Sequence, residues 1–130
     1  MTPLSRALLW LNRIRMESTQ LIKTVVAALE EIKAYDIAVL EVSGITALFD
    51  YIIIASADSN RQTRALANNV QEKIKAAGGR VYSQEGEQSG EWLLVDLGDA
   101  IVHIMLPAVR DYYNLEALWD EAKTVNDTAN

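Results

Sequence analysis

The most regular pattern of apolar and polar positions lies in the C-terminal half of the chain. Two apolar segments, Trp92–Leu97 and Ala100–Leu106, are separated by Gly98-Asp99, and Pro107 follows the second segment. Each segment has the length of a β-strand, and a Gly-Asp pair between two apolar runs favours a tight turn. Proline cannot continue a paired strand, so Pro107 sets the end of the second segment. The pattern predicts a β-hairpin.

A two-residue turn, at either Leu97-Gly98 or Gly98-Asp99, sorts the hairpin side chains into two faces, because successive strand residues point to opposite sides. One face is aliphatic and is expected in the core: Leu93, Val95, Leu97, Val102 and Ile104. The other face combines apolar and polar residues: Trp92, Leu94, Asp96, His103 and Met105. Two interpretations of the mixed face remain open. It is either a second buried layer under a helix, with the histidine hydrogen-bonded, or a partner-binding surface, because Trp and Met are enriched at interface centres.

Helical spacing of apolar residues predicts two long helices. The first covers residues 18–34, with Ser18 as its N-cap. The second begins at a capping box formed by Ser59 and Gln62, and ends at Gly78-Gly79, a typical C-cap. After the hairpin we expect two short helices, namely Pro107–Tyr113 and one that Asn114 caps and that reaches Trp119.

Runs of apolar and β-branched residues predict the remaining strands. Asp50–Ser56 (DYIIIAS) is apolar on both faces, which places it at the centre of the sheet. Asp36–Val42 reads as a largely buried strand, and Arg80–Ser83 as a short edge strand. Gln84–Gly90 is expected to be a mobile, acidic loop. The element order predicts an α+β fold, an α/β sandwich in which helices pack on a mixed sheet of roughly five strands.

One domain, residues 18–123, is expected between a basic N-terminal extension, residues 1–17, and a flexible tail, residues 124–130. The extension has too short an apolar run for a secretory signal. A transit peptide, a membrane-surface helix, a loosely ordered extension and an upstream start with Met16 as the functional initiator all remain open; we favour the last two.

Composition narrows the chemistry that the chain can support. It has no cysteine, one histidine and no apolar run of membrane-spanning length, as expected of a cytoplasmic protein without a membrane partner. Residues 1–16 contain three arginines and no acid, which leaves 9 Lys and Arg against 18 Asp and Glu in the remainder, a balance of −9. Such a body repels phosphate backbones, so direct sequence-specific nucleic-acid binding is not expected. It favours encounter with a basic protein, although the charge could also serve solubility alone.

Residue patterns by themselves indicate no enzyme. Asp96 and Asp99 could hold Mg²⁺ for nucleotidyl transfer, which is the enzymatic alternative, but Asp and Gly are also what a tight turn uses. No glycine-rich phosphate loop is present, and His103 has no evident nucleophile to activate. No cofactor and no metal are expected.

Several motifs occur together in one order. They are Asp50-Tyr51, Ser59-x-Arg61-Gln62, Trp92…Asp96-x-Gly98-Asp99…Val102-His103 and Arg110…Tyr113-x-Leu115-Glu116-x-Leu118-Trp119. In these motifs, and over about residues 18–122, the chain resembles the ribosomal silencing factors, also called the RsfS or Iojap family. Residues 1–16 lie outside the family pattern, and Met105-Leu106-Pro107 matches it only loosely.

The resemblance implies a small fold with nucleotidyltransferase-like topology but without the catalytic motif of that superfamily. It further implies binding to a basic protein of the large ribosomal subunit, the fourteenth of the large-subunit series. Bound there, such factors block joining of the small subunit and repress translation, mainly in nutrient-poor or stationary conditions; family members can also form homodimers. Carried over by position, the residues expected at the ribosomal contact are Trp92, Leu97, His103, Met105, Asp50 and Tyr51.

Overall fold

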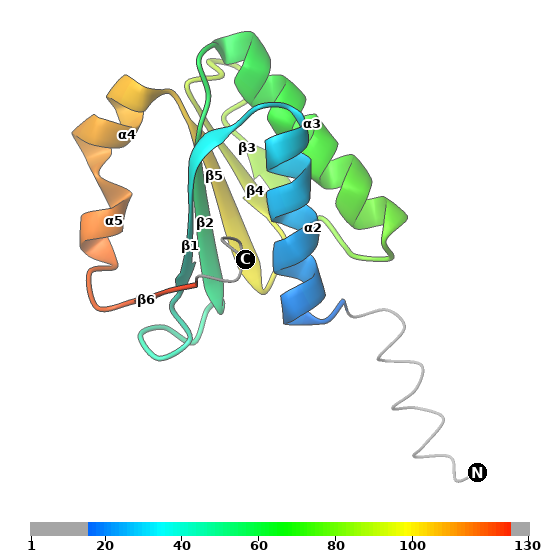
Figure 1. Cartoon of the computed structure of the whole chain (residues 1–130), viewed down its shortest axis with the longest axis vertical. Helices are drawn as coiled ribbons and strands as arrows, with labels where there is room; N and C mark the ends of the chain where they lie inside the picture. The colour runs from blue at the N-terminus through cyan, green and yellow to red at the C-terminus, as the bar shows by residue number, and fades with distance from the viewer. Residues whose placement is uncertain (1–15, 126–130) are drawn as a thin grey trace, which may run out of the picture.

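The computed structural model describes residues 16–125. Its helices are α2 (Ser18–Glu31), α3 (Asn60–Ala76), α4 (Pro107–Tyr113) and α5 (Leu115–Leu118). Its strands are β1 (Tyr35–Glu41), β2 (Tyr51–Ser56), β3 (Ser83–Glu85), β4 (Trp92–Asp96), β5 (Ala100–Met105) and β6 (Lys123–Thr124). Figure 1 shows the sheet between two groups of helices, with α2 and α3 on one side and α4 and α5 on the other.

All six strands form one sheet in the order β3-β4-β5-β2-β1-β6. Strands β2 and β5 run parallel, and every other neighbouring pair is antiparallel. The α+β class and the mixed sheet are therefore confirmed. Strand β2 lies between β1 and β5, and residues 52 to 56 are all buried, as their apolar sequence predicts.

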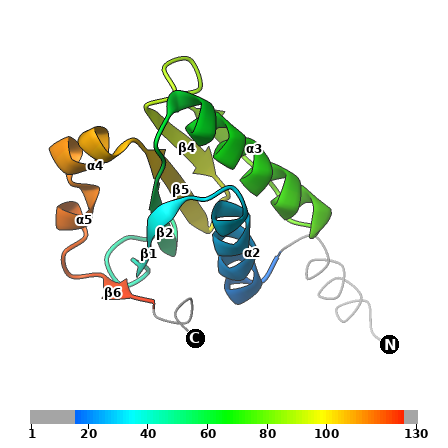
Figure 2. The same ribbon diagram turned by 45° about the horizontal axis from the view of Figure 1, so that its top comes forward.

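Two apolar cores lie on opposite faces of the sheet. They lie beneath the two groups of helices that Figure 2 shows on either side of it. The larger core joins the apolar stripes of α2 and α3 to the aliphatic face of the hairpin. The smaller core lies on the other face, where Ile52, Ile54 and Met105 meet Val109 of α4 and Leu115 of α5. Helices α2 and α3 bury six and five residues respectively, whereas α4 and α5 bury none completely. The second layer is therefore a partial cover.

The hairpin has the two-residue turn Gly98-Asp99, one of the two predicted forms. Leu97 N–H donates to the Ala100 carbonyl (2.9 Å), and Trp92 pairs with Met105 at the far end of the ladder. Gly98 has a φ of +85°, which is available to glycine without the strain that a Cβ would add. The register confirms that Leu93, Val95 and their aliphatic neighbours share the core face.

Helix α2 begins one residue earlier than the predicted cap implies. The residue at the N-cap position is Glu17, without a side-chain cap, so the expectation that Ser18 is the N-cap is wrong. The helix ends at Glu31 rather than at Ala34, because Lys33 already adopts a left-handed φ of +68°. Strand β1 itself begins irregularly, because Asp36 has a φ of +49° and the register with β2 shifts between Tyr35 and Ala38.

The start of α3 confirms half of the predicted capping box. Gln62 N–H donates to Ser59 Oγ at 3.0 Å, but the Gln62 side chain accepts from Asp58 N–H instead of from the cap residue. Its amide nitrogen also donates to the carbonyls of Ile32 and Lys33. One glutamine therefore ties the first turn of α3 to the end of α2.

The edge strand β3 lies three residues later than predicted, at Ser83–Glu85 instead of Arg80–Ser83. The loop that follows it is held by α3. Arg64 donates from Nε and Nη2 to the carbonyls of Glu87 and Gln88, both at 2.8 Å, and Thr63 Oγ1 donates to the Gly90 carbonyl. These bonds place the acidic loop beside the start of β4.

The C-terminal part differs from expectation in two details. Asn114 occupies the predicted N-cap position of α5, but it has a φ of +45° and its side chain makes no capping hydrogen bond. Strand β6 pairs with Leu40 and Glu41 of β1, and Val125 N–H donates to the Val39 carbonyl (2.9 Å). This pairing extends the sheet past residue 123, into the expected tail. The rest of the tail, residues 126–130, and residues 1–15 of the expected extension lie outside the described residues.

Candidate partner-binding face

The sheet face that carries α4 and α5 is left open over β3, β4 and β5. Ladder partners in antiparallel strands project to the same side, so two rows of side chains cross this area. One row is Glu85, Leu94 and His103, and the other is Ser83, Asp96 and Ile101. None of the six is completely buried. We call these residues, together with Trp92, the open face.

Aromatic side chains gather where the open face meets α4. The Trp92 ring lies 4.9 Å from the Tyr113 ring and 5.9 Å from the His103 ring, measured between centroids. Tyr112 packs edge-on against Tyr113 at 5.0 Å and is 81% exposed, and Tyr113 is itself 54% exposed. Large, rigid aromatic side chains that stay partly in water are a typical feature of protein interfaces.

His103 and Trp92 are joined by a hydrogen bond between two strands. The indole Nε1–H of Trp92 donates to His103 Nδ1 at 3.0 Å. Burial lowers the pKa of His103 from its usual 6.5 to about 4, because the charged imidazolium would lose hydration. The imidazole is therefore neutral at physiological pH, and the open face presents a neutral ring here.

Helix α4 is held beside the open face by the guanidinium of Arg110. Its Nη1 donates to the Asp36 carbonyl at 2.6 Å and to Ser56 Oγ at 2.9 Å. Its Nε and Nη2 donate to the two carboxylate oxygens of Glu116, at 3.0 and 3.2 Å. A two-pronged pair of this kind fixes direction as well as distance. Arg110 thereby connects α4 and α5 to the sheet and positions Tyr113 against Trp92.

The sequence model of a family described as "Ribosomal silencing factor during starvation" matches residues 15–130. The match includes every strand that forms the open face and both helices beside it. The chain belongs to the ribosomal silencing factor family.

Relatives and solved structures agree with this assignment. A ribosomal silencing factor from Chromobacterium violaceum is 55% identical over 108 residues, which cover 83% of this chain and 88% of the relative. A mouse relative named mitochondrial assembly of ribosomal large subunit protein 1 is 33% identical over 101 residues, 75% of this chain and 44% of its own length. A crystal structure of a Chromobacterium violaceum protein, 55% identical, aligns with a TM-score of 0.79 over 81% of this chain and 88% of that one.

Within this silencing-factor fold, only two of the six expected contact residues meet on the open face. They are Trp92 and His103. Met105 shares their side of the sheet but is fully buried in the smaller core, and Leu97 is 5% exposed in the larger core on the opposite side. Both side chains are therefore buried in the free protein, and their expected contact with a ribosomal protein stays a prediction.

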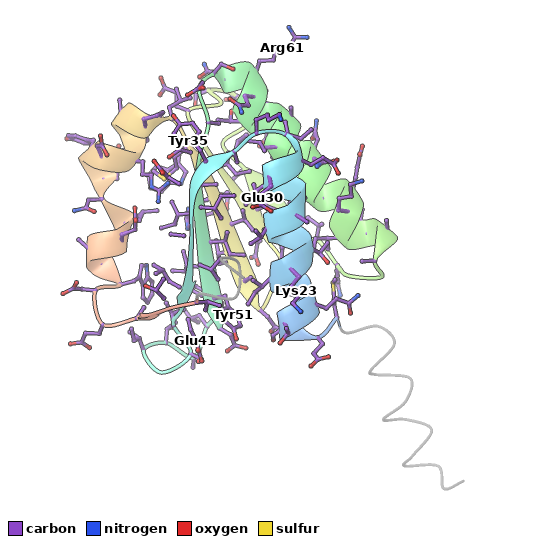
Figure 3. All side chains as sticks on the ribbon, viewed as in Figure 1. Lys23, Glu30, Tyr35, Glu41, Tyr51 and Arg61 are labelled. Carbon is purple, nitrogen blue, oxygen red and sulfur yellow. The ribbon has the colours of Figure 1, made fainter. Side chains whose placement is uncertain are left out.

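Asp50 and Tyr51 lie at the other end of the sheet. Tyr51 pairs with Glu41 and Ala100 at the end of the sheet where Figure 3 labels Tyr51 and Glu41. Trp92 pairs with Met105, the last residue of β5, at the opposite end. Tyr51 packs against the larger core, under α2 and α3. The structure therefore does not bring this pair together with Trp92 and His103.

The two aspartates of the enzymatic alternative serve the hairpin turn. Asp96 Oδ1 accepts from Gly98 N–H at 2.8 Å, and the Asp99 carbonyl accepts from the N–H groups of Asp50 and Tyr51. Among residues 16–125, no three His, Cys, Asp or Glu side chains are grouped closely enough to hold a metal ion. The bacterial relatives carry the name ribosomal silencing factor.

The residues that the family resemblance places at the ribosomal contact do not include Leu94, Ile101, Glu85 or the two tyrosines of α4. Strand alternation places Leu94 on the mixed face, so this residue could have been found from the pattern. Tyr112 and Tyr113 could not, because their position depends on how α4 packs against β4.

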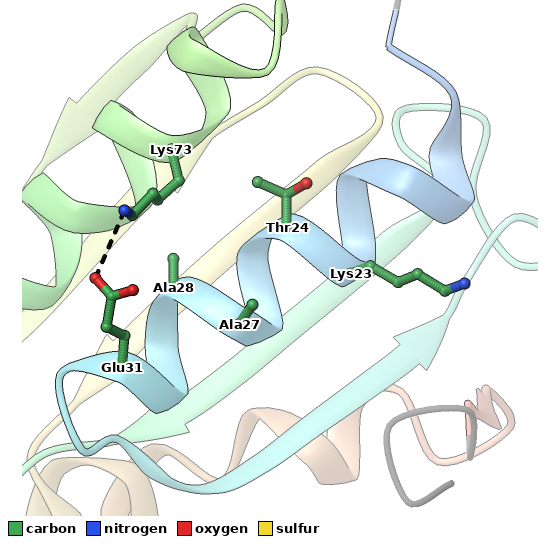
Figure 4. A pocket seen from close by; sticks show the side chains of 6 residues that line it. All are labelled: Lys23, Thr24, Ala27, Ala28, Glu31 and Lys73. Atoms are coloured by element: carbon green, nitrogen blue, oxygen red, sulfur yellow. Dashed lines mark ion pairs between the residues drawn. The ribbon is translucent and has the colours of Figure 1, made fainter.

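A shallow pocket lies on the other side of the sheet from the open face, between α2 and α3. It is lined by Lys23, Thr24, Ala27, Ala28, Glu31 and Lys73 (Figure 4). Lys73 pairs with Glu31 across it at 3.7 Å, and both side chains are about half exposed. An exposed ion pair of this kind contributes little to stability. No helix in the described part of the chain is long and apolar enough to cross a membrane.

Proposed function

We propose that this family member binds the large ribosomal subunit through the open face and the adjoining tyrosines of α4, and so keeps the small subunit from joining. The observation that supports this proposal is the half-buried Trp92 on a sheet face that the protein leaves uncovered. Its indole donates a hydrogen bond to His103, and its ring packs at a tilt against the ring of Tyr113. Such a centre, apolar and rigid with a polar edge, has the composition of an interface hot spot.

Charge favours a basic protein as the contact on the ribosome. The chain carries 18 acidic against 12 basic residues, and Glu85 and Asp96 stand at the edge of the open face. A surface of this sign is repelled by ribosomal RNA and attracted to a basic protein. We identify that protein with the fourteenth of the large-subunit series, which the family resemblance implies. The mouse relative, whose name couples it to the large subunit, supports the same subunit as partner.

Silencing of this kind requires only that the protein occupies the joining surface of the large subunit, without any chemical reaction. A folded body seated on the joining surface excludes the small subunit by its volume, so translation is repressed for as long as the complex lasts. No cofactor or metal is required. The protein would then act in the compartment that holds the ribosomes, the cytoplasm. If it forms a homodimer, the dimer must leave the open face accessible to the ribosome.

The test is co-sedimentation of the protein with separated large and small subunits. We expect binding to the large subunit alone. Tyr113→Ala and Leu94→Ala should each weaken it by roughly 10-fold or more, because truncated hot-spot residues cost about 2 kcal/mol. Trp92 is less suited to this test, since it also packs on the smaller core.

The matched control is Tyr82→Ala. Tyr82 is 57% exposed, close to the 54% of Tyr113, but it lies against Gly98 at the turn end of the hairpin. It should bind normally. Folded Tyr113→Ala and Leu94→Ala proteins that bind as tightly as the parent would refute the open face as the contact. Binding to neither subunit, with a melting temperature raised by nucleotide and Mg²⁺, would instead favour the enzymatic alternative.

A further inference from the structure

The hydrogen bond between Trp92 and His103 decides which imidazole nitrogen carries the proton. An indole nitrogen can only donate, so the bond at 3.0 Å requires an unprotonated Nδ1 on His103. A neutral imidazole has a single N–H, which must then be on Nε2. The fold thus locks one of the two neutral forms of this ring.

The Nε2–H of His103 has no protein acceptor within residues 16–125. The only polar contact that the ring makes there is the one with Trp92. At the same time, no buried side-chain nitrogen or oxygen of the described residues lacks a partner. The Nε2–H therefore reaches the surface, where water satisfies it in the free protein.

The surroundings of this donor are mostly apolar. Leu94 and Ile54 are the ladder neighbours of His103 on either side, and Trp92 borders it toward α4. Any molecule that covers the open face removes the water from Nε2–H. An apolar cover would leave the donor unpaired, at a cost of about 1–3 kcal/mol, whereas an oxygen acceptor would keep it satisfied.

We propose that the Nε2–H of His103 selects the partner: the ribosomal protein places an oxygen acceptor, a backbone carbonyl or a side-chain oxygen, over the middle of β5. The proposal depends on the proposed function, and it specifies the chemical group that the ribosomal protein presents to His103. Glu85 continues the same row at the edge of the sheet, so the partner carries its acceptor among basic side chains. Neutral donors recognise an oxygen by geometry, and the acidic edge supplies the attraction.

The first experiment measures the proton position directly. The chain contains one histidine, so its two ring nitrogens give unambiguous signals in nitrogen-15 NMR. At pH 7 we expect the Nε2–H form to predominate at least tenfold in the free protein. A predominant Nδ1–H form, or an even mixture, would overturn the proposal.

The second experiment compares two substitutions in binding to purified large ribosomal subunits. His103→Phe keeps a ring of similar size and removes the donor, and we expect roughly 10-fold weaker binding or more. His103→Gln can still accept from Trp92 and donate outward, so binding should stay within about threefold of the parent. This rescue would not be expected if the ring merely filled space.

The outcomes separate the two proposals. If His103→Phe is folded and binds normally while Tyr113→Ala binds weakly, the donor has no role but the open face remains the contact. If His103→Phe, Tyr113→Ala and Leu94→Ala all bind normally, the proposed contact itself is wrong. If His103→Phe does not fold, His103→Gln alone tests the proposal. A folded His103→Gln protein that binds weakly, although the parent has the Nε2–H form, would show that another outward donor cannot replace the imidazole. That result would overturn the proposal.

Discussion

At the scale of single residues, His103 shows how one hydrogen bond and partial burial define a chemical group. The ring is kept neutral because its partial burial disfavours the charged imidazolium, which lowers its pKa to about 4. An unfolded chain would return the pKa to about 6.5. The unfolded state therefore binds more protons than the folded state between these two values.

We predict that the free energy of unfolding falls as the pH decreases from 6.5 to 4. The contribution of His103 is fully present above pH 6.5, and about 3 kcal/mol of it is lost by pH 4. Urea unfolding at several pH values measures the effect, with His103→Gln as the control because glutamine does not titrate. Equal pH dependence in both proteins would contradict the assignment.

At the scale of elements, α4 and α5 are short helices that bury no residue completely, so their position depends on specific bonds. Arg110 supplies these, with its side chain only 12% exposed and bonded to Asp36, Ser56 and Glu116. The long helices α2 and α3 are held by broad apolar contact and need no such anchor. The position of Tyr113 beside Trp92 therefore depends on the hydrogen bonds of one guanidinium group.

We predict that Arg110→Lys lowers the free energy of unfolding by about 1–2 kcal/mol, because an ammonium cannot form the paired bonds to Glu116 and also reach Ser56. Binding to large subunits should weaken as well, since Tyr113 loses its fixed position. Urea unfolding and co-sedimentation measure the two effects.

Lys73→Arg and Lys73→Ala serve as controls for this prediction. Lys73 pairs with Glu31 on the exposed surface between α2 and α3, and its loss should change stability by less than about 0.5 kcal/mol. An Arg110→Lys protein as stable as these controls would show that α4 does not need the paired hydrogen bonds between Arg110 and Glu116.

At the scale of the whole molecule, the excess of acidic residues acts over a longer distance than any contact. The net charge of −6 should draw the protein toward a basic surface before the open face docks. We predict that the association rate constant falls roughly 10-fold between about 0.05 and 0.5 M salt at constant Mg²⁺, while the dissociation rate changes little. Stopped-flow or surface-based kinetics would measure both, and a salt-independent association rate would contradict electrostatic steering.

Much of the fold could be read from the chain because the signals are local. The apolar run before Ser56, the glycines after α3 and the Gly98-Asp99 turn each specify their own segment. Ser18 and Asn114 are both suitable capping residues, but Ser18 lies inside α2 and the Asn114 side chain makes no capping hydrogen bond. Strand β6 has no signal of its own, since two residues form a strand only when β1 is beside them.

The sequence by itself determined the class of fold, the hairpin with its two faces, the acidic surface and the likeness to the silencing factors, because composition and periodicity are carried by neighbouring residues. Only the tertiary structure decided what covers the mixed face. Packing of α4 and α5 buries Met105, leaves His103 and Leu94 open, and brings Tyr113 from a later segment against Trp92. Burial, the state of the imidazole and the extent of a surface depend on distant segments meeting, and no local pattern encodes them.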